Sequence, residues 1–252
     1  MPMSKHKQRK FDWKKVRWVL LLLVWVLASW LASQYVAAFV VNGVFGNLIV
    51  QSVLKLVVFS VMSSVLWLLL VILVPWKVLK MKTNREELGL SGLPTWTDVG
   101  LAPVGFAVYF VGALLVLALV TAIFPSVDWE TSQDFGIRFS ELVRVSDKIL
   151  VFAVMVILAP VVEEIIFRGW LYGKVRAKVP AWVGIVTVSV LFGSLHLFTG
   201  KELQWSAAVG IFCLSVVLCT LREITGTIWS GVILHMLVNG LGFYMRLIDG
   251  RF

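Results

Sequence analysis

The chain has 252 residues, of which 60% are hydrophobic and only 15% carry a charge. Soluble domains average about 45–50% apolar and about 25% charged residues, so this composition excludes an ordinary water-soluble fold and indicates a lipid bilayer. The net charge of +9 could point to nucleic acid. The basic residues, however, stand at the ends of apolar runs, as in the cytoplasmic loops of membrane proteins, so we expect no nucleic-acid partner.

Seven apolar runs have about the length of a membrane-spanning helix, which needs about 20 residues. They cover residues 17–41, 48–75, 99–124, 149–172, 181–199, 204–221 and 226–246. The first run is too long for the apolar part of a signal peptide, about 7–15 residues, and predicts a retained helix. The sequence therefore predicts an all-α fold, a polytopic transmembrane bundle of about seven helices.

Loops rich in lysine and arginine alternate with loops that have few of them, and this alternation predicts a cytoplasmic N-terminus. We expect an integral protein of a bacterial or archaeal cytoplasmic membrane, with the lipid bilayer as its first partner. The predicted divisions are a basic cytoplasmic tail at 1–16, three membrane helices with interfacial loops at 17–147, a functional helical core at 148–246 and a short C-terminal tail at 247–252.

Polar side chains inside the apolar runs are functional candidates, because each charged group costs about 2.5–3.5 kcal/mol on insertion scales. They concentrate in the second half of the chain. The candidates are Glu163, Glu164, Arg168, His196, His235 and Asn239.

The spacing of these candidates predicts how they face. Glu164 and Arg168 are four residues apart and share a helix face, so Arg168 is expected to neutralise and position Glu164. Glu163 points about 100° away and is left free for chemistry. His235 and Asn239 share a face in the last run.

Pro180 predicts a turn between the fourth and fifth runs. Glu164 lies 16 residues before it and His196 lies 16 residues after it, so an antiparallel hairpin places both at one depth. His235 lies about 14 Å into its run. We expect the polar groups to meet in the cytoplasmic half of the bilayer, which leaves the fifth run short beyond His196.

A water held between a carboxylate and an imidazole is what peptide hydrolysis needs. A buried glutamate can act as a general base, and His or Asn can donate hydrogen bonds to the oxyanion of a tetrahedral intermediate. The sequence has no G-x-S-x-G and no H-E-x-x-H, and Cys213 and Cys219 stand in an apolar run away from the histidines. Serine, thiol and zincin-type hydrolases are therefore disfavoured.

Three motifs carry a family resemblance. EEIIFR, FGSLH and HMLVN match the patterns EExxxR, FxxxH and HxxxN in this order on late helices. Residues 150–245 thereby resemble the CAAX protease and bacteriocin-processing family of intramembrane endopeptidases (CPBP, or Abi). The segment REELGL is also similar to family members.

The resemblance implies an intramembrane endopeptidase that hydrolyses membrane-associated or lipidated peptides, with a peptide or membrane-protein segment as substrate. It implies Glu163 as general base with His196, an oxyanion site of His235 and Asn239, and a supporting pair of Glu164 and Arg168.

Metal-free catalysis is favoured over a metalloprotease, because a cation beside the Arg168 guanidinium costs energy. If the enzyme did use a divalent metal such as zinc, its ligands would come from Glu163, Glu164, His196 and His235.

Two other readings remain open. The pair Glu164–Arg168 and the late-helix polar groups can be structural, since membrane helices use such groups to join one another. The chain can also be a non-catalytic immunity or regulatory protein that keeps the family fold. A transporter is disfavoured because its polar groups would be expected in both halves.

Overall fold

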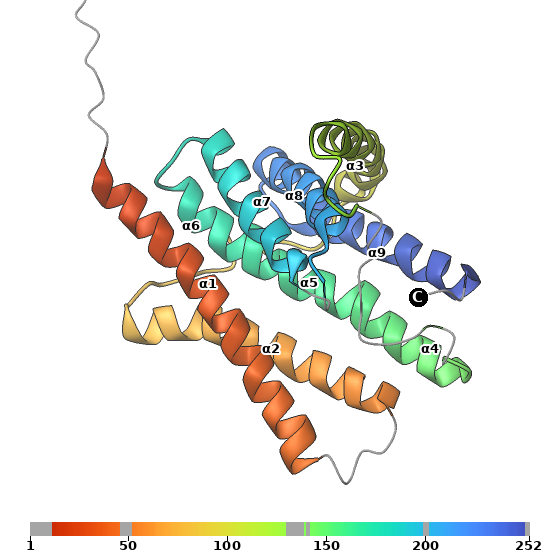
Figure 1. Ribbon diagram of the computed structural model, residues 1–252. Coiled ribbons are helices and arrows are strands. Elements are labelled where there is room, and N and C mark those ends of the chain that lie inside the picture. The colour runs from red at the N-terminus through yellow and green to blue at the C-terminus, as the bar shows by residue number, and fades with distance from the viewer. Residues whose placement is uncertain (1–11, 46–51, 130–138, 140–141, 199–201, 250–252) are drawn as a thin grey trace, which may run out of the picture.

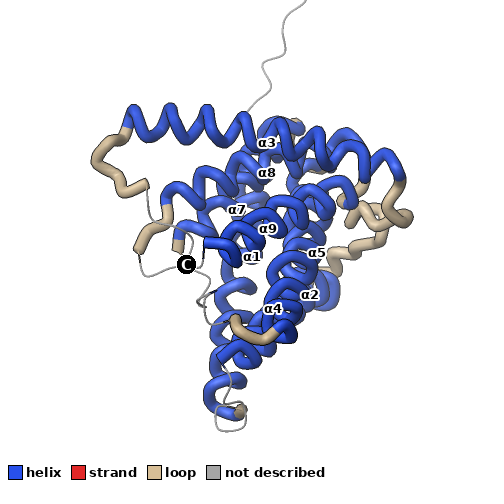
Figure 2. The backbone as a smooth tube through the Cα atoms, turned by 90° about the vertical axis from the view of Figure 1, so that its right-hand side faces the viewer, coloured by secondary structure: helices blue, strands red, loops and turns tan. Residues whose placement is uncertain are grey.

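The computed structural model describes residues 12–45, 52–129, 139, 142–198 and 202–249, and the regular elements in these ranges are all helical (Figure 2). The first three membrane helices are α1 (Trp13–Phe39), which continues into the π-helical η1 (Val40–Val44), α2 (Ser52–Val78) and α3 (Trp96–Ile123). The last three are α7 (Ala181–Leu197), α8 (Trp205–Thr225) and α9 (Trp229–Asp249).

Between these two groups runs one unbroken helix of 32 residues, Val145–Arg176. It passes from α4 (Val145–Phe152) through the π-helical η3 (Ala153–Leu158), α5 (Ala159–Glu164) and the π-helical η4 (Ile165–Leu171) to α6 (Tyr172–Arg176). Figure 1 shows it crossing the molecule beside α1 and α2 on one side and α7 and α9 on the other. We call it the long helix.

The predicted polytopic helical bundle is confirmed. Within the described ranges, six helices are long and apolar enough to cross a membrane, and the seventh, α7, has 17 residues and is shorter. The first helix begins at Trp13, where Asp12 accepts a hydrogen bond from the Lys14 N–H as its N-cap. Of the predicted terminal tails, residues 1–11 and 250–252 lie outside the described residues, and the predicted domain boundaries stay predictions.

One end of the bundle collects basic side chains, and we call it the basic end. Here α1, α3, α7 and α9 begin and α2, the long helix and α8 end. Lys174 of the long helix bonds Glu87 at 2.6 Å, Arg222 of α8 donates to the Glu87 carbonyl, and Lys178 lies over the Trp18 ring of α1. The other end, where α1 and α3 end and α8 begins, is called the far end.

A buried carboxylate joins α3 to α9 at the basic end. Asp98 forms a capping box with Thr95 at the start of α3. It also accepts hydrogen bonds from Thr227, at 3.1 Å, and from Ser230, at 2.7 Å. The side chain is 2% exposed, and the network fixes the start of α9, the helix that carries His235.

The main apolar core lies in the half of the bundle nearer the basic end. Val26 of α1 and Val71 of α2 pack with Ile166, Phe167 and other residues of the long helix and with α7. The Trp67 and Phe167 rings pack in a T-shaped arrangement, with their centroids 5.7 Å apart. This core holds the long helix firmly on the side toward α1 and α2.

Candidate active site

The two adjacent glutamates on the long helix have different environments. Glu164 is fully buried, whereas the Glu163 side chain is 21% exposed and lines a cavity. They lie at the junction between α5 and the π-helical η4, and such π stretches occur frequently at functional sites. The sequence-based prediction that the two carboxylates face different surroundings is therefore confirmed.

Glu164 is held by an arginine one turn later. Arg168 Nη1 lies 2.8 Å from Glu164 Oε1, and both side chains are fully buried. Arg168 Nη2 donates to the Ser215 hydroxyl of α8 at 2.6 Å, and the guanidinium lies over the Phe192 ring, 4.5 Å from its centroid. The predicted ion pair is thus present and is tied to α7 and α8.

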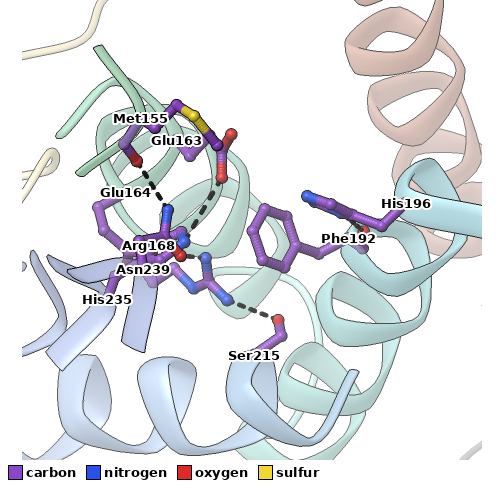
Figure 3. A network of polar contacts seen from close by, with 9 residues as sticks. All are labelled: Met155, Glu163, Glu164, Arg168, Phe192, His196, Ser215, His235 and Asn239. Atoms are coloured by element: carbon purple, nitrogen blue, oxygen red, sulfur yellow. Dashed lines mark hydrogen bonds and ion pairs between the residues drawn. The ribbon is translucent and has the colours of Figure 1, made fainter. Parts of the chain in front are cut away.

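His235 joins the two glutamates (Figure 3). Its Nδ1 lies 2.9 Å from Glu164 Oε1, and its Nε2 lies 3.8 Å from Glu163 Oε2. A carboxylate without a proton can only accept, so Nδ1 carries the hydrogen in that contact and Nε2 is the nitrogen presented to Glu163. Glu164 therefore orients His235, and Arg168 in turn orients Glu164.

Asn239 lies one turn beyond His235 and bonds the backbone of the long helix. Its Nδ2 donates to the Met155 carbonyl at 2.9 Å. Met155 belongs to the π-helical η3, and the residue five positions later is Pro160, which has no N–H to offer that carbonyl. One amide hydrogen of Asn239 therefore replaces a backbone bond, and it joins α9 to the long helix.

His196 lies near the end of α7 and lines the same cavity. Its Nδ1 is 2.9 Å from the Phe192 carbonyl, and the two rings pack in a T-shaped arrangement with centroids 5.0 Å apart. The carbonyl can only accept, so Nδ1 carries the hydrogen here too. The ring extends from α7 toward the side where Glu163 lies (Figure 3).

The cavity has a volume of about 610 Å³ and brings together the predicted reactive residues. Glu163, His196, His235 and Asn239 all contribute to its wall, whereas Glu164 and Arg168 lie behind it. The prediction that the late helices bring their polar side chains to one place is confirmed. His235, for which the resemblance implied a place in the oxyanion site, makes the contact with Glu163.

The four potential metal ligands do not form a ligand set in the described part of the chain, where no group of three or more His, Cys, Asp or Glu is arranged to hold an ion. Glu164 Oε1 already accepts from Arg168 and from His235. His196 Nδ1 is used on a backbone carbonyl. Metal-free catalysis therefore stays a prediction.

The sequence did not reveal three contributors to the site. Ser215 accepts from Arg168, and Met155 accepts from Asn239. Gly231 leaves room for Glu164, because a Cβ there would lie 3.1 Å from Oε2. Gly231 was detectable only as a small residue one helical turn before His235.

Comparison with known proteins now adds to this geometry. Residues 145–241 match the family model described as type II CAAX prenyl endopeptidase Rce1-like. Searches of curated proteins and of solved structures gave no match. The matched segment starts with the long helix and contains all six predicted site residues. The resemblance seen in the three motifs is thereby confirmed: over residues 145–241 the chain is similar to the Rce1-like CAAX prenyl endopeptidases.

Proposed function

We propose that the chain is an intramembrane endopeptidase that hydrolyses peptide bonds of membrane-associated or lipidated peptides with a water activated by Glu163. The observation that most directly supports this proposal is the contrast between two neighbouring carboxylates. Glu164 is neutralised by Arg168, while Glu163 faces the cavity and lies 3.8 Å from His235 Nε2. The family resemblance of the segment 145–241 supports the same reaction class.

The distance between Glu163 and His235 suits a shared water. At 3.8 Å the two groups are too far apart for a direct hydrogen bond, whereas a water about 2.8 Å from each can contact both at an angle. Glu163 takes one proton from this water while the water oxygen forms a bond to the peptide carbonyl carbon. When the C–N bond breaks, Glu163 returns that proton to the leaving amine.

His235 has the geometry of an oxyanion donor. Its Nδ1–H is committed to Glu164, so Nε2 is the nitrogen beside the base, and it can donate to an oxyanion when it carries the second ring proton. A donor fixed before the reaction stabilises developing negative charge without reorganising. We assign His196, on the α7 side of the cavity, to orienting the water with Glu163. Asn239 keeps its predicted oxyanion role through its second amide hydrogen and also positions α9 through Met155.

The test compares Glu163→Gln with Glu202→Gln, a matched change at an exposed position. Both purified variants are reconstituted in liposomes and assayed with an internally quenched lipidated peptide. Glu163→Gln should lower turnover at least about 100-fold, because general-base catalysis contributes about 10²–10⁴. Its melting temperature in detergent should equal that of Glu202→Gln, which keeps full activity.

Two outcomes contradict the proposal. Glu163→Gln protein that keeps more than a tenth of the activity rejects Glu163 as the base. Wild-type protein that is folded yet hydrolyses no peptide of this class favours the non-catalytic immunity or regulatory protein instead.

A further inference from the structure

In the described part of the chain, most of the cavity lies on one side of the glutamates. On α9 it runs from His235, near the start of the helix, to Arg246, about 16 Å farther toward the far end. On α1 it is lined by Trp30 and Gln34, in the second half of that helix, and on α8 by Ser206 at its beginning. All these positions lie on the far-end side of the catalytic groups.

Buried side chains fill the space between the glutamates and the basic end. Ile166, Phe167 and Leu171 are fully buried, and Trp170 is 1% exposed. These residues pack with α1, α2 and α7 in the main core, and they follow the glutamates along the long helix toward the basic end. None of these four side chains lines the cavity.

The short α7 explains why the space lies on the other side. α7 has 17 residues, about 25 Å at α-helical rise, whereas the long helix beside it has 32. The chain turns back at this depth, since the Gln204 N–H donates to the Leu197 carbonyl. Gln34 of α1 and Ser206 of α8 both line the cavity.

The distribution of Lys and Arg indicates which end of the bundle lies on the cytoplasmic side of the membrane. The described loops and helix ends at the basic end carry Lys14, Lys15, Lys77, Lys80, Lys82, Arg85, Lys174, Arg176 and Lys178. Such an excess of Lys and Arg marks the cytoplasmic side of a membrane protein. The far end, with the open part of the cavity, is then on the opposite side.

We infer that substrate segments reach Glu163 from the non-cytoplasmic side of the membrane, through the part of the cavity between α1 and α8–α9 beyond the end of α7. The substrate class is therefore a polypeptide exposed on, or anchored in, the outer leaflet. This inference concerns the side from which the site is reached, and it rests on the proposed function only in treating what enters the cavity as a substrate.

The test maps water access in intact cells. Cys213 and Cys219 are first replaced by alanine, and single cysteines are introduced as Gln34→Cys and Ser206→Cys in the cavity. Ser126→Cys, exposed beyond α3, and Lys178→Cys, exposed at the basic end, serve as controls for the two sides. Cells are treated with a membrane-impermeant maleimide before or after permeabilisation.

Gln34→Cys, Ser206→Cys and Ser126→Cys should be modified in intact cells to the extent seen after permeabilisation. Lys178→Cys should be modified at least tenfold less until the cells are opened. Cavity cysteines that react only together with Lys178→Cys, or that do not react while Ser126→Cys does, overturn the inference. The labelling requires no turnover, so its failure is separate from a failure of Glu163→Gln to lose activity.

Discussion

Asp98 and Glu163 are both carboxylates within membrane helices, yet their surroundings differ. Asp98 accepts hydrogen bonds from Thr95, Thr227 and Ser230 and is 2% exposed. Glu163 has its one ion-pair contact among the described residues with His235, at 3.8 Å, and faces the cavity. A carboxylate whose acceptor positions are filled joins helices, whereas one that faces a cavity can hold and activate a water.

Glu164 shows an intermediate arrangement. It is as buried as Asp98, but its donors are the charged Arg168 and the ring of His235. Its Oε2 has no hydrogen-bond partner among the described residues. Glu164 therefore has a positioning role, because it holds the His235 ring that faces Glu163. We therefore expect mutations at these three carboxylates, or at their partners, to have different effects.

The largest effect is expected for Arg168→Met, which leaves Glu164 buried without its cation. Breaking a buried ion pair costs about 3–5 kcal/mol. The free energy of unfolding in mixed detergent micelles should fall by that amount. Lys174→Met is the matched control, because its partner Glu87 is about half exposed and such pairs contribute about 0–1 kcal/mol. Equal stability of the two variants would show that the pair at Arg168 is not structurally important.

A smaller loss is expected for Asp98→Ala. Hydrogen bonds to a charged group contribute about 1.5–3 kcal/mol, and the buried Ser230 hydroxyl loses its acceptor. We expect a loss of about 2–3 kcal/mol in the same unfolding experiment. Asp98→Asn keeps the shape and one acceptor and should lie between alanine and the wild type. Asparagine that is as destabilising as alanine would mean that charge, rather than the number of acceptors, holds the two helix starts together.

The sequence predicted those parts of the site that depend on spacing along one helix or across one turn. The pair Glu164–Arg168 follows from the separation of four residues. Equal distances from Pro180 predicted one depth for Glu164 and His196. The same symmetry about Pro180 relates Arg168 and Phe192, which lie 4.5 Å from guanidinium to ring centroid. Such features depend only on helix geometry.

The rest depends on how separate helices are rotated against one another. The resemblance implied an oxyanion site of His235 with Asn239 and a pairing of Glu163 with His196, and the contacts of His235 with both glutamates were not predicted. The two π stretches, η3 and η4, change the register of the long helix on either side of the glutamates, and a rule of 100° per residue does not include them. The partners Ser215 and Met155 carry no motif.

Gly231→Ala tests the space beside Glu164 and is expected to have a moderate effect. The added Cβ would lie 3.1 Å from Glu164 Oε2 and 3.5 Å from Leu218 Cδ2. Overpacking typically costs about 1–3 kcal/mol, and the displaced carboxylate would also turn His235 and lower turnover. Gly112→Ala, where a Cβ meets nothing within 4 Å, should instead be neutral or up to about 1 kcal/mol stabilising. Full activity of Gly231→Ala would argue that the position of Glu164 is not critical.

The smallest effect is expected from a strong chelator. Turnover of the reconstituted wild-type protein should stay within about twofold, because the proposed reaction uses only Glu163, a water and the histidines. Glu164 Oε1 is shared by Arg168 and His235, and a divalent cation would have to displace the guanidinium or lie beside it. Activity abolished by chelation and restored by zinc would overturn this expectation. Glu164 would then have to release Arg168, and Arg168→Met should bind zinc more tightly than the wild type.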